Sequence, residues 1–440
     1  MSKKTMIALL LAAVCMLLCA CGGKQADLKP EEELPDLSAS EIALVLGSGE
    51  IGKLDEYTAL RVVDLSGSEN FEEIYAWSQA HPSVVVYYDV KLPTGETVGN
   101  RVTELDLSKL TGAQTDEAIR CMSCLPKVAR VELGSERSGF GFEDIRRLQE
   151  AFPQVRFSYA FTLYGHNFNI TDTEIDLYHV PVDDNAEAVR QAMACMPKLT
   201  YVDLDSCGAD YERLAEIRDE FPDVKVVWRV LFGDAYSVRT DVEKILASKP
   251  SVGGGLYIGN VEPLKYCTEV KYLDVGHNED LATIDFVAYM PKLEVAILAM
   301  AKYTDLSPLA NCKQLEYLEI QTTPVYDLSP LAGLTNLRHL NICNTCVQDI
   351  SPCYSLTKLE RFWIGGWVAV PREQVELMQQ AAPNCNINTG AGDPTEGQWR
   401  YIDMNLDTYV MIMHPRYALL QEQFGYTDKD FSFWWNDPLY

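Results

Sequence analysis

Apolar positions in the second half of the chain recur at a fixed interval of 22 residues. Leucine occupies one of these positions in four successive copies, at Leu293, Leu315, Leu337 and Leu359. From each leucine onwards the pattern is close to L-x-x-L-x-L, whose later positions alternate apolar and polar as on a strand that buries one face. A single copy cannot bury its apolar side alone, so the interval predicts stacked copies that share one core.

A second motif repeats between these strands. The segments DLSPLA, DLSPLA and DISPCY begin at Asp305, Asp327 and Asp349, also 22 residues apart. Together the two motifs resemble the leucine-rich repeat, in the short form of bacterial proteins of internalin type. The resemblance is specific over 265–366 and implies one parallel strand and one outer turn in each regular repeat of 22–23 residues. It also implies that the following side chains point inward: Leu293, Ala296, Leu298, Leu315, Leu318, Ile320, Leu337, Leu340 and Ile342.

The first half has a longer period, of about 70 residues. Strand-like V-D-L or V-E-L motifs begin at Val63, Val131 and Val202, and each precedes an amphipathic stretch that ends at a proline. This order predicts three strand-and-crossover units in each block, two of them with a helix. A separate doubly wound α/β domain would give the same order of elements. The repeated block spacing favours irregular, long leucine-rich-like repeats over 39–264.

The predicted fold class is therefore α/β. We expect a leucine-rich repeat solenoid with about fourteen strands in one curved parallel sheet, and with helices and 3-10 turns on its convex side. Residues 367–440 follow no repeat, but they contain a predicted helix from Pro371 to Ala382 and many aromatic residues, including Trp399 and Trp435. A solenoid must cover its last open core, so this region is predicted to be an aromatic-rich C-terminal cap. An aromatic platform for a ligand is the alternative.

The first residues predict export and lipidation. Lys3 and Lys4 precede an uncharged, largely apolar run to Ala20, which predicts a signal peptide over 1–20. The sequence LCACGG at its end resembles the bacterial lipobox, and the resemblance implies that Cys21 carries a lipid. That lipid would hold the chain at the extracytoplasmic face of the cell membrane. An ordinary secretion signal is the alternative, and the polar residues 21–38 predict a flexible tether.

The charge of the chain excludes some partners. The formal net charge is −27, and removal of Lys3 and Lys4 with the signal would make it −29. Such a field repels nucleic acid and offers no attraction to an anionic bilayer. We therefore expect no nucleic-acid partner, and association with the membrane through the N-terminal lipid only.

Ten cysteines follow Cys21, and four of them form two CxxC pairs, Cys121/Cys124 and Cys343/Cys346. The two pairs lie roughly 40 Å apart along the stacked strands, which is too far for one zinc site. Other cysteines stand where sister repeats have leucine, so buried thiols are predicted. A Cys343–Cys346 disulfide is the alternative, which an exported protein permits.

Catalytic signatures are missing from the sequence. It contains no G-x-S-x-G elbow, no phosphate-binding P-loop and no H-E-x-x-H motif, and its six histidines are scattered. The chain is therefore expected not to be an enzyme, and no cofactor or metal is expected. The alternative is an enzyme whose site lies in the irregular ends.

The outward strand positions carry the candidate binding chemistry. Side chains alternate along a strand, so the residue between two inward positions points to the concave face. That position is acidic in seven of ten predicted strands, and a tyrosine, histidine or arginine stands two residues earlier in several of them. Like charges in neighbouring strands repel unless they are compensated, which favours a cationic partner: a basic peptide, an amine, or Ca²⁺ that bridges carboxylates. The predicted ligand-binding residues are Asp203, Asp274, Tyr317, Glu319 and Trp363.

These observations predict a cell-surface, lipid-anchored module that binds a basic protein or peptide through its concave face. The alternatives are a structural envelope protein or a cell-wall glycan-binding protein, in which the acidic face only keeps the chain soluble. The strand pattern further predicts that Leu318 and Leu340 are wholly buried. Glu319 and Asn341 are expected to face outward and to tolerate substitution.

Overall fold

The computed structural model describes residues 36–234, 236–248, 256–257, 259–390, 398–405 and 410–425. Cys21 and the signal peptide lie outside the described residues. The chain divides into two compact units, Met1–Arg101 with Ser123–Pro126, and Val102–Met122 with Lys127–Tyr440. Within the described residues, no helix has the length and apolar character needed to cross a membrane.

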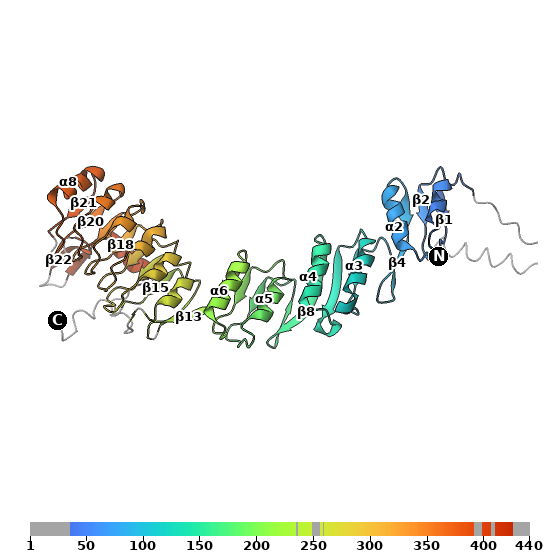
Figure 1. Ribbon diagram of the computed structural model, residues 1–440, viewed down its shortest axis with the longest axis horizontal. Helices are drawn as coiled ribbons and strands as arrows, with labels where there is room; N and C mark the ends of the chain where they lie inside the picture. Colours follow the sequence, from blue (N-terminus) through green and yellow to red (C-terminus); the bar gives the residue numbers. More distant parts are fainter. Residues whose placement is uncertain are drawn as a thin grey trace, which may run out of the picture. The chain divides into compact units, whose positions relative to one another are not determined.

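The first unit contains a small parallel sheet. Its strands follow the order β1-β2-β3, and the connections are a 3-10 helix, η1, and an α-helix, α2 (Figure 1). Val63 of β2 and Ile74 of α2 are fully buried, as their apolar spacing requires. An antiparallel hairpin, β4–β5, follows the third strand. The bounds are β1 Glu41–Ala43, η1 Ile51–Glu56, β2 Val62–Asp64, α2 Phe71–Ala80, β3 Val85–Tyr87, β4 Asp89–Lys91 and β5 Thr97–Gly99.

The second unit begins with two blocks of about 70 residues that confirm the predicted order of three strands and two helices. The first block is β6 Glu104–Asp106, η2 Gly112–Gln114, α3 Thr115–Ser123, β7 Arg130–Ser135, η3 Glu136–Ser138, α4 Phe142–Ala151, β8 Arg156–Leu163 and β9 His166–Asn169. The second block is β10 Glu174–Asp176, α5 Glu187–Met193, β11 Tyr201–Asp203, α6 Tyr211–Glu220, β12 Lys225–Val227, β13 Arg229–Phe232 and β14 Tyr236–Arg239. In both blocks the third parallel strand leads into an antiparallel hairpin.

The regular repeats form a parallel sheet of seven strands, β15 to β21. The register places Tyr317 opposite His339, and His339 opposite Arg361, so the 22-residue interval is the spacing of neighbouring strands. The strands are β15 Lys244–Leu246, β16 Tyr272–Asp274, β17 Val295–Ile297, β18 Tyr317–Glu319, β19 His339–Asn341, β20 Arg361–Trp363 and β21 Asn386–Asn388. Five 3-10 helices of the described residues lie between them: η4 Glu262–Tyr266, η5 Asp285–Tyr289, η6 Ser307–Asn311, η7 Ser329–Leu331 and η8 Ser351–Ser355.

The repeated D-L-S-P motif forms the entrance to η6 and η7, and its variant D-I-S-P forms the entrance to η8. An oxygen of Asp305 accepts a hydrogen bond from the backbone N–H of Ser307 at 2.8 Å, and Asp327 does the same for Ser329. This contact satisfies a donor that the start of a helix leaves free. The predicted inward leucines, including Leu318 and Leu340, are fully buried on the other side of the strands.

The parallel strands do not form one continuous sheet of fourteen strands, so that expectation was wrong. Among the described residues they form separate sheets, β1–β3, β6–β8, β10–β12 and β15–β21. The hairpins explain the breaks, because β3, β8 and β12 each lead into an antiparallel pair before the next parallel strand begins. The sequence period identified the blocks but did not reveal the hairpins.

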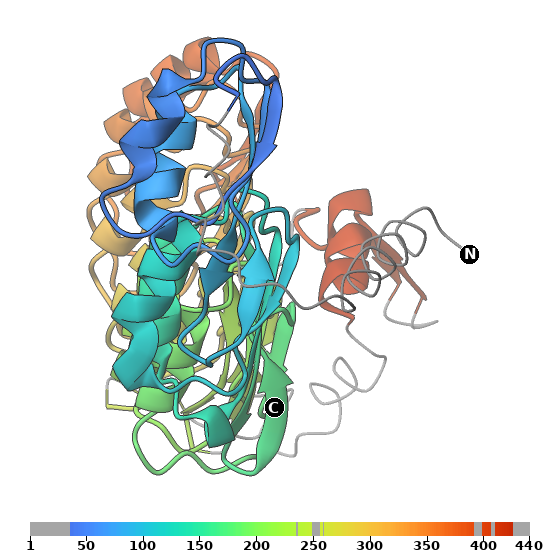
Figure 2. The same ribbon diagram turned by 90° about the vertical axis from the view of Figure 1, so that its right-hand side faces the viewer.

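The region predicted to be one C-terminal cap has two parts. Helix α8, Arg372–Ala381, and strand β21 continue the repeat beside β20. The hairpin of β22, Tyr401–Asn405, and β23, Val410–Met413, is followed by α9, Pro415–Phe424. In the regular repeats, α8 and the 3-10 turns lie on one side of the parallel strands. Helix α9 lies on the other side of these strands, where its residues pack against strand residues (Figure 2).

Candidate functional site

The first and third residues of strands β16–β20 point away from the leucine core and form one surface, here called the strand face. Its residues are Tyr272, Asp274, Val295, Ile297, Tyr317, Glu319, His339, Asn341, Arg361 and Trp363. Nine of them are buried and Tyr272 is partly buried. Residues within 398–425, here called the C-terminal segment, cover this face: Trp399, Tyr417, Leu420 and Phe424 join it in one apolar cluster.

Glu319 is the charged centre of the strand face and is fully buried. Its carboxylate accepts hydrogen bonds from Gln321 Nε2 at 2.8 Å and from the hydroxyl of Tyr317. Two adjacent residues of the C-terminal segment also donate to it, Trp399 through Nε1 and Arg400 through Nη2, each at 2.8 Å. Burial would raise the pKa of Glu319, but the Arg400 guanidinium and these hydrogen bonds hold it at about 2.

Trp399 fills a socket of aromatic and cationic groups. Its ring centroid lies 5.2 Å from that of Trp363 and 5.5 Å from that of Tyr317. The guanidinium of Arg361 lies 4.4 Å from the Trp399 ring centroid, which is a cation–π geometry. Arg361 also donates from Nη1 to the Trp399 carbonyl at 2.8 Å, so the strand face contacts both the backbone and the side chain of this residue.

Helix α9 supplies the remaining contacts. Tyr417, Leu420 and Phe424 are buried at spacings of three and four, which place them on one helical face. The ring centroids of Phe424 and Tyr272 lie 6.2 Å apart. The guanidinium of Arg416 lies 5.3 Å from the ring centroid of Tyr317. The helix therefore extends the apolar and cation–π contacts of Trp399 toward β16.

The acidic column on the strands has a local explanation. In β2, β6, β10, β11 and β16 the terminal aspartate accepts a hydrogen bond from the backbone N–H two residues later, at 2.9 to 3.0 Å. Glu132 makes the equivalent bond to Gly134 at 2.8 Å. Short acidic side chains are favoured where the chain turns out of a strand, because they satisfy this N–H. The column therefore does not by itself indicate a ligand.

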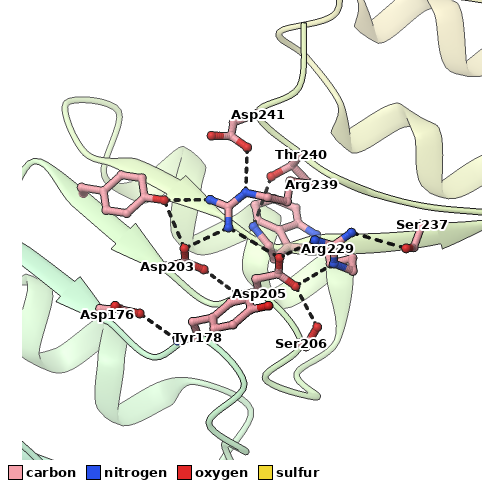
Figure 3. Close-up of polar contacts among 12 residues, drawn as sticks. Asp176, Tyr178, Asp203, Asp205, Ser206, Arg229, Ser237, Arg239, Thr240 and Asp241 are labelled. Carbon is pink, nitrogen blue, oxygen red and sulfur yellow. Dashed lines mark hydrogen bonds and ion pairs between the residues drawn. The ribbon is translucent and has the colours of Figure 1, made fainter. Parts of the chain in front are cut away.

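Asp203 lies in a different sheet from the other predicted ligand-binding residues, and it belongs to an ion-pair network (Figure 3). Arg239 Nη1 of β14 lies 3.0 Å from an oxygen of Asp203. Arg229 of β13 binds both oxygens of the fully buried Asp205, at 3.0 and 2.9 Å. Burial raises the pKa of Asp205, but the guanidinium contacts lower it, and the net result is a pKa below its ordinary value. The network attaches hairpin β13–β14 to the sheet and leaves Asp203 committed to an internal partner.

The structure thus gathers four of the five predicted residues, Asp274, Tyr317, Glu319 and Trp363, on one face. Glu319 and Asn341 point away from the leucine core, as expected, but they are not exposed, because the C-terminal segment buries the face to which they point. The expected tolerance to substitution assumed an exposed face, so its physical basis is lost. The sequence reasoning missed Trp399, Arg400 and Arg416. The signal that could have identified Trp399 and Arg400 was an adjacent Trp-Arg pair in an aromatic-rich C-terminal region of a chain whose strands carry an acidic column.

The cysteines agree with the prediction of buried thiols. Ten free cysteines lie in the described residues, and nine of them are buried, including Cys343. Cys346 is exposed. Within the same residues no group of three or more His, Cys, Asp and Glu side chains has a geometry that could hold a metal ion.

The stacked parallel strands β15–β21, with 3-10 turns in their connections, form a repeat structure, and the solved structures similar to this chain include leucine-rich repeat proteins. Similar solved structures include an internalin, InlF, of Listeria monocytogenes, with 18% identity, a TM-score of 0.31, and coverage of 81% of this chain and 84% of that chain. A leucine-rich repeat protein of Leptospira interrogans shows 13% identity, a TM-score of 0.31, and coverage of 76% and 91%. Internalin C2 of Listeria monocytogenes shows 18% identity, a TM-score of 0.28, and coverage of 52% and 87%.

The strand registers of this chain itself show the repeat, because residues 22 positions apart lie opposite each other in β17–β20. No protein-family model matches the sequence, and no curated protein matches it.

Proposed function

We propose that this protein is a non-enzymatic, protein-binding module that a lipid on Cys21 anchors at the extracytoplasmic face of the cell membrane. The strand face of β16–β20 binds a protein segment with basic character. One observation carries this proposal: the face buries Trp399 and ion-pairs Arg400 of a segment that is not part of the parallel sheet. The lipobox-like sequence LCACGG supports the anchor.

The contacts favour a peptide ligand over a glycan. Arg361 donates to the carbonyl of Trp399, which is a contact to polypeptide backbone. Glu319 accepts from an indole N–H and from a guanidinium, and both are side-chain groups of proteins. Buried aromatic and arginine anchors of this kind commonly dominate the energy of protein interfaces.

Capture from intact cells that carry the full-length chain tests the binding face. Chemical cross-linking is followed by comparison of the wild type with Glu319→Gln and with a control, Glu316→Gln, which changes an exposed carboxylate of the same repeat. We expect the partner to be lost from Glu319→Gln and retained by the control. Equal capture by both variants would exclude the strand face as the binding surface.

Detergent-phase partitioning and acyl labelling test the anchor. The wild type is expected to enter the detergent phase and to incorporate labelled fatty acid, whereas Cys21→Ala does neither. Labelling of Cys21→Ala at wild-type level would exclude Cys21 as the lipidated residue. Cys19→Ala is the matched control and is expected to behave as the wild type does.

A further inference from the structure

We infer that the C-terminal segment is an internal competitor for the strand face, and that the external partner displaces it with the same aromatic–arginine chemistry. This inference rests on the proposed function and adds to it a partner class and a mode of regulation. The partner is a protein segment with a tryptophan or another large aromatic residue directly followed by arginine. That is the chemistry of Trp399-Arg400, which Glu319 binds through both of its oxygens.

The segment can leave without disturbing the repeats. Strands β22 and β23 pair only with each other among the described residues, while β15–β21 form their own sheet. The segment is held mainly by side chains, together with the Arg361 bonds to the carbonyls of Trp399 and Gln398 at 2.8 and 3.3 Å. Detachment therefore breaks no hydrogen bond of the parallel ladder. It exposes a face whose shape the buried leucines on the other side continue to maintain.

The internal fit is incomplete. Arg361 Nη2, Gln321 Oε1 and Arg400 Nε are buried and have no hydrogen-bond partner among the described residues. Buried polar groups are normally paired, and each unpaired group weakens the contact that buries it. Arg361 is 5% exposed, and burial lowers its pKa. A partner that brings a carboxylate or carbonyl oxygen to Arg361 Nη2 satisfies this donor and binds more tightly than the internal segment.

The segment also keeps an apolar outer side. Ile402, Ile412 and Leu419 are 46%, 52% and 44% exposed, although Tyr417 and Leu420 beside them are buried. The segment therefore buries only one of its sides against the strand face. An external competitor therefore has to replace only this one-sided contact. A segment that is held on one side is easier to displace than an element that is buried on all sides.

The covalent connection makes the competition strong in spite of the incomplete fit. Residues 389–397 join Asn388 of β21 to the segment, so the segment remains close to the face after it detaches. A short connection of this kind gives an effective concentration on the order of millimolar. An external segment binds only to the open fraction, so its apparent affinity is reduced by that fraction.

The test uses the full-length chain and a fluorescent synthetic peptide with the sequence of residues 398–425. The chain variant Trp399→Ala/Arg400→Ala, here called the opened chain, removes the two side chains that anchor the C-terminal segment. It leaves the residues of the strand face unchanged. We expect the peptide to bind this variant at least about 10-fold more tightly than the wild type, by fluorescence anisotropy. The matched control is Arg372→Ala, which removes an exposed arginine that pairs with Glu376 on α8, and it is expected to behave as the wild type does.

Two further binding measurements distinguish failure of the competitor inference from failure of the strand face as the binding site. A peptide with the same two alanine changes is expected not to bind, and the opened chain with Glu319→Gln is expected to lose the peptide. Equal binding to the opened and wild-type chains overturns the competitor inference, while the Glu319-dependent capture from cells still tests the proposed function. Peptide binding that survives Glu319→Gln overturns the strand face as the site for both.

Amide hydrogen exchange of the unmodified chain provides a measurement that does not depend on variants. If the segment detaches as a unit, amides of α9 exchange faster than those of β18 and β19. Equal protection of α9 and these strands would show that the segment opens only with the whole repeat, and it would overturn the inference even if the alanine variant fails to fold.

Discussion

Arg361 donates a hydrogen bond from Nε to Nδ1 of His339 at 3.1 Å, across neighbouring strands. An arginine only donates, so Nδ1 of this histidine is the acceptor and the ring is neutral with its proton on Nε2. Burial lowers the pKa of His339 to about 2, and the nearby guanidinium cations of Arg361, Arg416 and Arg338, together with His414, act in the same direction. Nε2 lies 4.0 Å from Glu360.

This pair predicts acid sensitivity. The unfolded histidine takes up a proton near pH 6.5, whereas the folded one stays neutral, so its contribution to stability is present above pH 6.5 and is lost as the pH falls. Between pH 6.5 and 5 the loss is up to about 2 kcal/mol. His339→Gln is expected to flatten the dependence of thermal unfolding on pH in this range. An unchanged slope in this variant would assign the acid sensitivity to other groups.

Glu319 gives a second, separate pH window. Its folded pKa is about 2, below the ordinary value of 4.5, because Arg400 and its hydrogen bonds stabilise the charged form against burial. Its contribution is therefore complete above pH 4.5 and is lost as the pH falls toward 2. We expect the tryptophan fluorescence of the wild type, to which Trp399 of the segment contributes, to show a further transition below pH 4.5. Glu319→Gln should lack that transition.

Leu318 and Glu319 are adjacent, but we expect their replacement by alanine to destabilise the fold for different physical reasons. Leu318→Ala is expected to cost roughly 2–5 kcal/mol by loss of burial and formation of a cavity. Glu319→Ala is expected to cost roughly 3–5 kcal/mol, because it removes the carboxylate that pairs with the largely buried Arg400. Adding Arg400→Ala to Glu319→Ala should recover part of that loss but none of the loss in Leu318→Ala. Chemical denaturation measures all of these variants, with Glu316→Ala as the exposed control.

Asp205 is expected to be a stability residue and not a ligand residue. Asp205→Asn removes the charge that faces Arg229 and Arg239 in a buried site, with a cost of roughly 3–5 kcal/mol. Asp223→Asn, at an exposed position in the same block, should cost little. Denaturant unfolding checks both variants. A cost below about 1 kcal/mol for Asp205→Asn would show that the ion pairs behave as exposed ones do.

The repeated aspartates predict a smaller and more local effect. Asp327→Ala removes the acceptor of the Ser329 N–H at the start of η7, and it should cost about 1 kcal/mol. Asp327→Asn keeps an oxygen in the same place, so it should retain most of the stability. Thermal unfolding distinguishes the two. Equal losses would attribute the effect to charge instead of the hydrogen bond.

The core and its register could be predicted from sequence because a period is a local and repeated signal. The positions of Leu318 and Leu340, the opposed Tyr317 and His339, and the turn at Asp305 all follow from spacing. Each repeat contacts its neighbours in the same way, so one copy informs the next.

The occupant of the strand face could not be predicted in this way. Glu319 and Arg400 are separated by 81 positions and lie in segments with no common period. Arg229 and Arg239 likewise meet their carboxylates only after the hairpin folds back. The acidic column did indicate that a cation should lie opposite the strands. It could not indicate that the cation at Glu319 belongs to the same chain.

Cys346 is the exposed thiol among the ten cysteines of the described residues. Burial raises the pKa of Cys312, Cys353 and Cys385 to about 12, which keeps these thiols protonated and slow to react at neutral pH. Among the described thiols, a maleimide dye added to the folded protein will therefore attach chiefly at Cys346. Cys346 therefore offers an attachment point for single-molecule fluorescence in the connection that follows β19, the strand beside Trp363 of β20.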